Sequence, residues 1–483
     1  MPPKKIRKQQ KRIRKRILDA IIRRIEATDS LLEKLALSYA LEQRNNLEPL
    51  LRQMFAAEAA QHSGLQMPRS LWSDICNRVL VKKALFPKSC AVLKDQGQAL
   101  IDYRWRKLEL RRSLGLGWTA TQREKFLAPE SIPTVSLPML KKRWPPKDVW
   151  LSEAPTTGLL WERHFQEAKL QDKRIERKDV LISSDGDSWQ KTIKAGESVI
   201  IRDAQTGQIV LVVIRNFCNH QGVLDWAIKI VQAAVNIKKS VRLDDPGKLV
   251  MNGYTSGSRN APSVVWAKNL LQSPTRLFES PQELESFDFQ VSSTYALMWN
   301  MARSKLPPEI LADIDKFVDG EGVRAVMDGN GTMKGYYGLK LKEEYYEFHS
   351  AELAHPQGNY ARNYSRFCHH EKNAHDYCLA WTISRLQDPS SGGNFYVADY
   401  GIKVEASTDM MVAWKGAHFH GTTLPDVDPS KLDTDFQQLG LSIATGGRLL
   451  KALREVKRGE VLEAYLFKRV AELEDEDYKN GRI

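Results

Sequence analysis

Five short segments between residues 369 and 422 decide the fold: HHEKN (His369–Asn373), SSGGNFYV (Ser390–Val397), DYGIKVE (Asp399–Glu405), MMVAWKG (Met410–Gly416) and HFHGT (His418–Thr422). Short apolar runs, rich in β-branched and aromatic residues, alternate here with turn signals that contain Gly, Asp and Ser. Short strands at this spacing are typical of an all-β sandwich or barrel, including the jelly-roll double sheet. We therefore expect mostly strands and turns from about residue 331 to residue 450.

Five of the ten histidines fall in this stretch, and three side chains have the pattern of metal ligands. His369 and Glu371 are separated by one residue, His370, so both point to the same side of an extended chain. His420 follows His369 by 51 residues, enough for several strands to return across a small barrel. Two imidazoles and a carboxylate on one face of an ion suit non-heme Fe(II). His418 shares the face of His420, and the His375–Asp376 pair is a lower-ranked alternative, because adjacent residues point to opposite faces of a strand.

A family resemblance follows from these motifs. In the order HxE-KN … GG-N-F … DYGIKV … G-x-x-x-H-G-T, the chain resembles the Fe(II)/2-oxoglutarate dioxygenases of the double-stranded β-helix fold. It looks most like the fungal group related to the TET/JBP nucleobase oxygenases. The resemblance covers about residues 180–450 and is specific over about 370–450. The fold expected is α+β, with a double-stranded β-helix (jelly-roll) catalytic core, flanking helices and a helical N-terminal region.

The resemblance also implies roles for individual residues. His369, Glu371 and His420 would bind Fe(II), and Arg448, in the segment ATGGRLL, would hold the distal carboxylate of the cosubstrate 2-oxoglutarate. A bidentate Arg–carboxylate pair suits that task. Glu371 stands where the family has Asp, and Arg448 follows His420 by 28 residues, which makes PDVDPSKLDTDFQQLG an insertion. The implied activity is oxidation of 5-methylcytosine or another nucleobase in DNA.

Two other hypotheses stay open at this point. One is a catalytically inactive nucleic-acid-binding or mobile-element-associated protein, and the other is an oxygenase that acts on a protein or a small molecule. Aromatic, cationic and amide side chains interleave just before the metal motif: Asn359, Tyr360, Arg362, Asn363, Tyr364 and Arg366. They either contact a nucleotide by stacking and charge or are ordinary residues of a surface strand.

The charge of the chain is concentrated at its N-terminus. Of the formal net charge of +13, residues 1–25 carry +10, from eleven Lys or Arg and one acid, Asp19. The run KKIRKQQKRIRKR (Lys4–Arg16) is typical of a nuclear-localisation or nucleic-acid-binding segment, so we expect a nuclear protein that contacts DNA. Five scattered cysteines without CxxC spacing argue against a disulfide framework and favour a reducing, intracellular compartment. No apolar run is long enough to span a membrane, and the charged N-terminus differs from a secretory signal.

The chain divides into five expected segments. Residues 1–25 form a basic tail, 26–118 a helical region, and 119–178 a Pro-rich linker or wrapping segment. Residues 179–455 form the double-stranded β-helix dioxygenase domain, and 456–483 a C-terminal helix and tail. Within the third segment the expectation rests on six prolines between Thr119 and Gly158. The oligomeric state is not predicted by any of these features.

Overall fold

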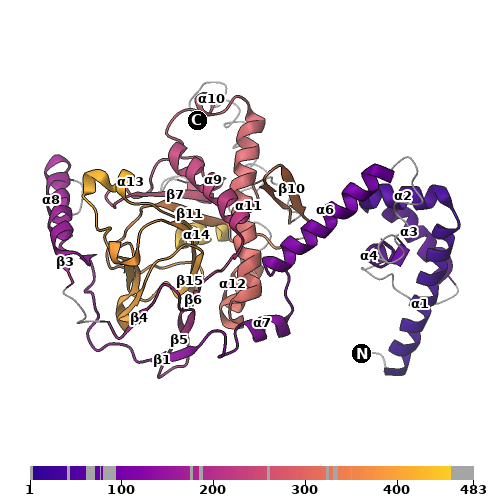
Figure 1. The fold of residues 1–483 in the computed structure, drawn as a ribbon, viewed down its shortest axis with the longest axis horizontal. Helices are drawn as coiled ribbons and strands as arrows, with labels where there is room; N and C mark the ends of the chain where they lie inside the picture. Colours follow the sequence, from indigo (N-terminus) through magenta and orange to yellow (C-terminus); the bar gives the residue numbers. More distant parts are fainter. Residues whose placement is uncertain are drawn as a thin grey trace. The chain divides into compact units, whose positions relative to one another are not determined.

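The computed structural model describes residues 4–40, 44–60, 71–76, 78–79, 94–173, 178–183, 189–257, 262–321, 326–329, 335–349 and 351–457. The chain forms two compact units, residues 1–111 and 112–483. Figure 1 shows the first as helices and the second as a mixture of strands and helices. The architecture is therefore mixed, with a large multi-stranded sheet and flanking helices, as the α+β expectation required.

The first unit is built from helices, of which α1 to α4 share an apolar core. Their bounds are α1 (Lys4–Glu26), α2 (Asp29–Ala40), α3 (Arg44–Ala59), α4 (Leu71–Cys76) and α6 (Lys94–Ser113), the last of which runs past the division at Arg112. Apolar residues three or four apart place Ile17, Ile21 and Ile25 on one side of α1, where they are buried. The predicted basic tail, residues 1–25, is therefore part of this helical region, because its apolar stripe packs against α2 and α3.

The two larger sheets of the second unit share a core, and β10-β9 and β2-β3 form separate two-stranded sheets. The larger sheet has the strand order β1-β5-β6-β15-β12-β17-β11-β7-β8, and the smaller has the order β16-β13-β14-β4. Apolar side chains from both sheets belong to one buried cluster, which includes Val213, Val397, Ile402 and Val412. The strands of the large sheet are β1 (Thr134–Leu137), β5 (Val199–Asp203), β6 (Ile209–Ile214), β7 (Lys248–Gly257), β8 (Pro262–Trp266), β11 (Gln357–Arg362), β12 (Tyr377–Arg385), β15 (Met410–Lys415) and β17 (Gln438–Ile443).

The smaller sheet consists of β4 (Lys191–Ile193), β13 (Phe395–Val397), β14 (Ile402–Val404) and β16 (His420–Thr422). An antiparallel bridge between His369 and His420 extends it on the β16 side. The strands expected from the five sequence pieces are thus present, including the runs of β13, β14 and β15. The Gly392–Gly393 pair just before β13 has φ of +74° and +68°, values that glycine adopts readily at a turn.

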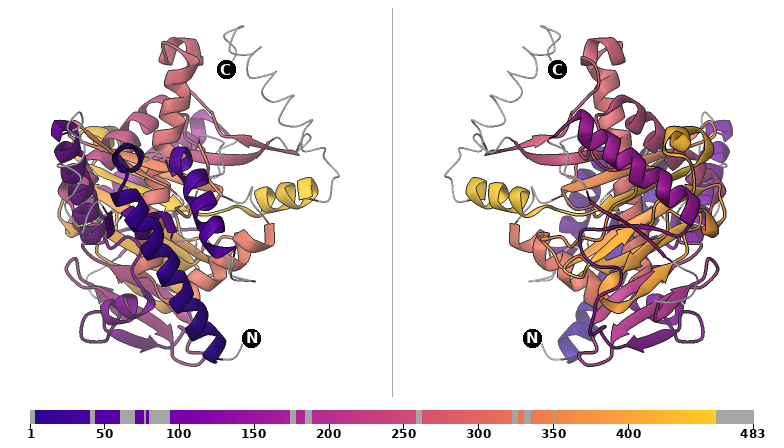
Figure 2. Two further views of the ribbon diagram at one scale, coloured as in Figure 1. Left: turned by 90° about the vertical axis from the view of Figure 1, so that its right-hand side faces the viewer. Right: turned by 90° about the vertical axis from the view of Figure 1, so that its left-hand side faces the viewer.

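Helices cover one side of the large sheet. Strands β7 and β11 lie beside α9 (Gln221–Ile237), and α11 (Pro281–Lys305) packs against α9 and β9 (Figure 1). Figure 2 shows α14 (Gly447–Lys457, yellow) beside the β7–β8 hairpin, where Leu449 and Leu453 join Tyr254 and Val264 in a small core. The remaining elements are α7 (Ala120–Phe126), α8 (Pro155–Gln171), β2 (Trp150–Ser152), β3 (Val180–Ile182), α10 (Pro274–Leu277), α12 (Pro308–Glu321), β9 (Tyr337–Leu341), β10 (Glu344–Phe348) and α13 (Leu432–Asp435).

Two sequence-based boundaries differ from the structure. The Pro-rich segment 119–178 contributes α7, α8 and two strands, since β1 pairs with β5 and β2 pairs with β3. Extended chain can pair wherever its own residues keep their N–H groups, and β1 begins just after Pro133 and lies at the sheet edge. At the C-terminus α14 begins at Gly447, inside the expected catalytic domain, and residues 458–483 lie outside the described part of the chain.

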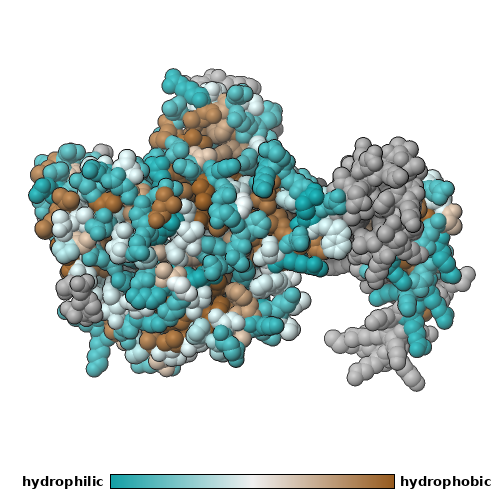
Figure 3. Space-filling view, viewed as in Figure 1, coloured by the Kyte–Doolittle hydropathy of each residue, from teal (hydrophilic) through white to brown (hydrophobic). Residues whose placement is uncertain are grey.

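The surface of the second unit mixes polar and apolar residues on the face seen in Figure 3, with no single colour dominating it. The most exposed large apolar side chains in the described residues are Leu243 at 85%, Leu170 at 81% and Leu386 at 70%. Within the described chain, no helix combines the length and the apolar character that crossing a membrane demands.

Candidate metal centre

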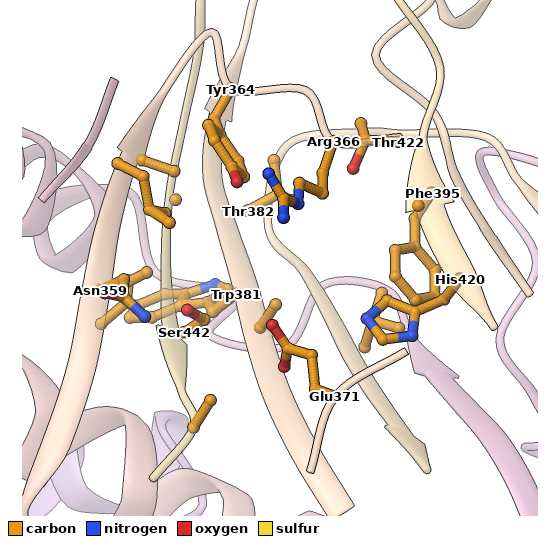
Figure 4. Close-up of a pocket in the computed structure, with 18 of the residues that line it drawn as sticks. Asn359, Tyr364, Arg366, Glu371, Trp381, Thr382, Phe395, His420, Thr422 and Ser442 are labelled. Atoms are coloured by element: carbon orange, nitrogen blue, oxygen red, sulfur yellow. The ribbon is translucent and has the colours of Figure 1, made fainter. Parts of the chain in front are cut away.

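Three side chains expected as metal ligands converge in the second unit. A nitrogen from His369, a carboxylate oxygen from Glu371 and a nitrogen from His420 all lie within 4.8 Å of one another. Among the described residues, these three are the only group of His, Cys, Asp or Glu side chains whose possible ligand atoms lie this close together. Figure 4 shows Glu371 and His420 directed into the same cavity. The three ligand predictions are thus brought together in space.

The backbone fixes where these side chains start. The amide of His369 donates to the carbonyl of His420 at 2.9 Å, and the amide of His420 donates back to the carbonyl of His369 at 2.7 Å. The amide of Glu371 donates to the carbonyl of Gly416 at 2.9 Å. Strand β16 is in turn held by β13, through pairing of His420 with Val397. All three ligand positions are therefore held by main-chain hydrogen bonds.

Each imidazole is oriented by a carbonyl group. His369 Nδ1 lies 2.9 Å from the carbonyl oxygen of Phe367, and His420 Nδ1 lies 2.7 Å from that of His418. A carbonyl oxygen only accepts, so both Nδ1 atoms donate, and in the neutral form of each ring Nε2 presents the lone pair. This outer contact is the one that metal-binding histidines usually make. His369 Nε2 faces Glu371 Oε1 at 3.5 Å, so lone pairs converge where a cation would stabilise them.

The protonation states suit metal binding near neutral pH. Burial, together with the nearby His369, lowers the pKa of His420 to about 4, which keeps this imidazole neutral. Burial acts to raise the pKa of Glu371, but the neighbouring His369, His420 and Asn373 side chains outweigh it and bring that pKa to about 2. Glu371 is therefore a carboxylate and His420 a neutral donor, the forms that coordinate an ion.

A hydrogen bond from Asn373 holds the carboxylate ligand in place. Asn373 Nδ2 donates to Glu371 Oε2 at 3.2 Å and lies 2.9 Å from Cys378 Sγ on β12. The backbone of Asn373 also bridges to Gly446, near the end of β17. Asn373 thus connects the ligand segment to the large sheet and keeps one oxygen of Glu371 turned away from His369.

The two alternative sources of ligands point elsewhere. His418 Nδ1 lies 3.6 Å from Asp399 Oδ2, and Asp399 is itself held by Arg143 at 2.6 Å. His375 is buried, its Nδ1 donates to the carbonyl of Tyr377 at 2.6 Å, and its Nε2 accepts from the amide of Thr445 at 3.2 Å. Neither histidine belongs to the converging group.

A cavity of about 580 Å³ opens over the three ligands between the two sheets. Its wall beside His420 is aromatic, with Phe395 and Trp414 ring centroids 5.1 Å apart and Trp414 5.5 Å from the His420 ring. The opposite wall comes from the large sheet, where Figure 4 places Asn359 on β11, Thr382 on β12 and Ser442 on β17. The three converging side chains thus border a cavity of the size that small ligands occupy.

Comparisons with known proteins add little to this geometry. No protein-family model matches the chain, and no curated protein matches it. The solved structure of NgTET1 in complex with 5mC DNA aligns with 60% of this chain and 91% of that chain, at 12% identity and a TM-score of 0.33. A likeness of this degree decides neither fold nor function, so the argument for the site rests on its own residues.

The predicted cosubstrate residue, Arg448, lies at the start of α14 and lines the same cavity. Its side chain is exposed, and Nη2 donates to the carbonyl of Gly257 on β7 at 3.3 Å. The structure thus places Arg448 at the cavity without placing it among the three ligands.

A second arginine, Arg366, lies deeper in the cavity wall. Its side chain is 16% exposed, and Nη1 contacts both carboxylate oxygens of Asp245 at 2.6 and 2.7 Å. Tyr364 donates its hydroxyl to the same carboxylate at 2.6 Å. Figure 4 shows Arg366 directed into the cavity between Tyr364 and Thr422. Arg366 is thus an oriented cation facing the metal-binding group.

Sequence reasoning missed the residues that hold this arrangement. Asn373 stands in the HHEKN motif, but nothing in the motif indicates that its amide contacts Glu371. Asp245 precedes Arg366 by 121 residues, in a segment whose structure was not predicted from the sequence. Only the pairing of β7 with β11 brings the two together, so no local signal in the sequence reveals their contact.

Proposed function

We propose that this chain is an Fe(II)/2-oxoglutarate-dependent dioxygenase that oxidises 5-methylcytosine or another nucleobase in DNA. The observation that carries the proposal is the convergence of His369, Glu371 and His420 in one cavity. Two neutral imidazoles and one carboxylate make up the facial set of non-heme Fe(II) oxygenases. The same donors would suit a structural zinc ion less well, since such sites usually have four protein ligands and often cysteine.

The strand order supports a double-stranded β-helix for the core. The strands β15-β12-β17-β11 form the centre of the large sheet, and the His369 segment followed by β16-β13-β14 forms the opposing sheet. In chain order from β11 to β17 the strands therefore alternate between the two sheets except at the β13–β14 pair, which lies within the smaller sheet, an order consistent with jelly rolls. In this arrangement the ligands lie on the smaller sheet and its bridge, at one open end of the sandwich.

The cavity contains cations that would hold 2-oxoglutarate. Arg366 has a side chain 16% exposed and is oriented by Asp245, while Arg448 is exposed. A guanidinium pairs well with a carboxylate because its N–H groups match the two oxygens. Bound Fe(II) with this cosubstrate supplies a means of oxidising a C–H bond with O₂. Residues of this chain bind and orient the reactants, and the aromatic wall of Phe395 and Trp414 limits the access of water to His420.

The nucleobase assignment rests on the shape and charge of the site. A cavity of about 580 Å³ would accommodate a planar ring beside the cosubstrate, and its aromatic wall would offer a stacking surface. Arg242 also lines the cavity and would contact a phosphate. The cationic face of α1 would add nonspecific contacts to DNA and would serve for nuclear entry.

The proposal is tested by anaerobic titration of the full chain with Fe(II) and 2-oxoglutarate, with the visible charge-transfer band of the iron–cosubstrate chelate as readout. We expect a band in the wild type that is lost in His420→Ala. His418→Ala is the matched control, because it removes an adjacent imidazole that faces Asp399. Absence of the band in folded wild type contradicts the iron site.

The substrate class is tested separately. Wild type is incubated with Fe(II), 2-oxoglutarate and O₂ and with duplex DNA that contains 5-methylcytosine, and the nucleosides are analysed by mass spectrometry. Oxidised methylcytosine supports the nucleobase assignment. A chelate band and cosubstrate turnover without any change in the DNA would favour a protein or small-molecule substrate. A chain that binds DNA without a chelate band would be the catalytically inactive binding protein.

A further inference from the structure

The segment that joins α9 to β7 is a loop fixed at both ends. Ser240 Oγ donates to the carbonyl of Arg242 at 3.0 Å and accepts from the amide of Leu249 at 3.2 Å. At the other end, Asp245 is buried and paired with Arg366. Gly247 follows with a φ of +73°, and a Cβ there would lie 2.3 Å from the carbonyl oxygen of Asn363. The ends of this loop therefore cannot move freely.

The tip of the same loop presents apolar side chains to solvent. Val241 is 38% exposed and Leu243 is 85% exposed, the largest value among the large apolar side chains of the described residues. Arg242 stands between them and is also exposed. A single exposed Leu on a surface is ordinary. Here, however, it projects from a loop whose conformation is held by its two anchored ends.

The position of the tip relates it to the metal centre. Val241 and Arg242 line the cavity over the three ligands, and Val241 to Asp245 also line a second cavity of about 370 Å³. Arg242 and Arg366 border both cavities. The loop is thus the partition between the mouth of the metal site and a neighbouring depression, with Leu243 on the side of the depression.

The neighbouring depression has cationic and aromatic walls. Lys178 Nζ lies 4.3 Å from the centroid of the Phe367 ring, and the Arg366 guanidinium lies 4.0 Å from it. Arg242 is a third cation at this depression. Arg366 is paired with Asp245, and Lys178 Nζ lies 3.4 Å from Asp148 Oδ1. Cations spaced along such a depression fit a phosphate backbone that runs past the metal site.

From these observations we infer that the loop Ser240–Gly247 is a finger that inserts Leu243 into the base stack of duplex DNA, in the gap left by the nucleotide that enters the metal cavity. This inference rests on the proposed nucleobase substrate. An enzyme that acts on a base inside a duplex must extrude it, and apolar side chains inserted between bases offset the lost stacking. Arg242, next to Leu243, would contact a phosphate beside the gap.

The inference is tested by base extrusion, measured without iron. The probe is a duplex with one 5-methylcytosine pair beside 2-aminopurine, whose fluorescence rises when its neighbour unstacks. We expect a rise with wild type, and Leu243→Ala should lower the equilibrium constant for extrusion at least about tenfold, the value of burying a Leu side chain. Leu243→Phe, which keeps an apolar wedge, should restore most of the rise.

Leu170→Ala is the matched control, because Leu170 is 81% exposed and lines neither cavity. It should leave the fluorescence rise unchanged. An equal rise with wild type and Leu243→Ala overturns the finger, and so does the absence of a rise with wild type on a duplex that anisotropy shows to be bound. The iron–cosubstrate chelate band is scored independently, so failure of the metal centre is distinguished from failure of the finger.

Discussion

Shortening the carboxylate ligand by one methylene tests the site most directly. Glu371→Asp gives this chain the residue type that the resembling family has at that position. The backbone at residue 371 is held by the hydrogen bond from its amide to the carbonyl of Gly416. The Cα atom therefore cannot move inward to compensate for the shorter side chain. The carboxylate would therefore withdraw by about 1.5 Å, the length of one C–C bond.

The magnitude follows from the distances in the site. Two ligands at about 2.1 Å from an ion and at right angles to each other lie roughly 3 Å apart. His369 Nε2 and Glu371 Oε1 are 3.5 Å apart, so the wild-type pair has to close by about 0.5 Å. Asp would have to close by up to about 2 Å and would also lose Asn373, whose contact is 3.2 Å long. We expect Fe(II) affinity to fall roughly 10- to 100-fold.

The assay is anaerobic competition for Fe(II) against a coloured chelator, with thermal unfolding as the check that each variant is folded. Glu371→Gln is the companion variant, because it keeps the length and the Asn373 contact region but removes the charge, and it should bind Fe(II) weakly as well. If Glu371→Asp bound Fe(II) as tightly as wild type, the backbone would not set the position of the ligand. The reasoning from main-chain hydrogen bonds would then be refuted.

Three further predictions follow from single contacts. Arg366→Lys should raise the KM for 2-oxoglutarate more than Arg448→Lys, because Arg366 is enclosed; equal effects in steady-state kinetics would contradict this order. Burial lowers the pKa of His355 well below its ordinary 6.5, so the unfolded chain binds this proton more readily than the folded chain. The free energy of unfolding should therefore fall as pH drops below about 6.5. Urea unfolding of His355→Leu should show a smaller decrease of that free energy over the same pH range. Ile21→Ala should destabilise the helical unit by about 2–4 kcal/mol in chemical unfolding, while Lys15→Ala should change it little.

The sequence was most informative where chemistry and periodicity coincide. The short apolar runs of β13, β14 and β15 are visible because each is bounded by turn residues. His369 and Glu371 could be paired from spacing alone, since alternate residues share a face, and His420 followed from the need for a third ligand on a later strand.

Elsewhere local composition was misleading. Residues 1–25 were predicted to be a basic tail because lysine and arginine dominate there, but a helix needs only one apolar stripe to pack, and Ile17, Ile21 and Ile25 provide it. The strand β7 reads as part of a Gly- and Ser-rich loop, yet its pairing with β11 depends on main-chain groups that composition does not report. The contact of Asp245 with Arg366 arises only from that pairing.

The two reciprocal backbone hydrogen bonds between His369 and His420 affect how metal binding and folding depend on each other. These bonds join the two ligand-bearing segments through the peptide backbone, so the ordering of the imidazoles is completed during folding. Binding should therefore be uncoupled from folding, in contrast with zinc fingers, which unfold without their metal. Chelators should leave a native chain whose amide protons at both histidines exchange slowly. Such a chain would accept different divalent ions in turn, and its choice among them would reflect their supply in the cell and their ligand preferences.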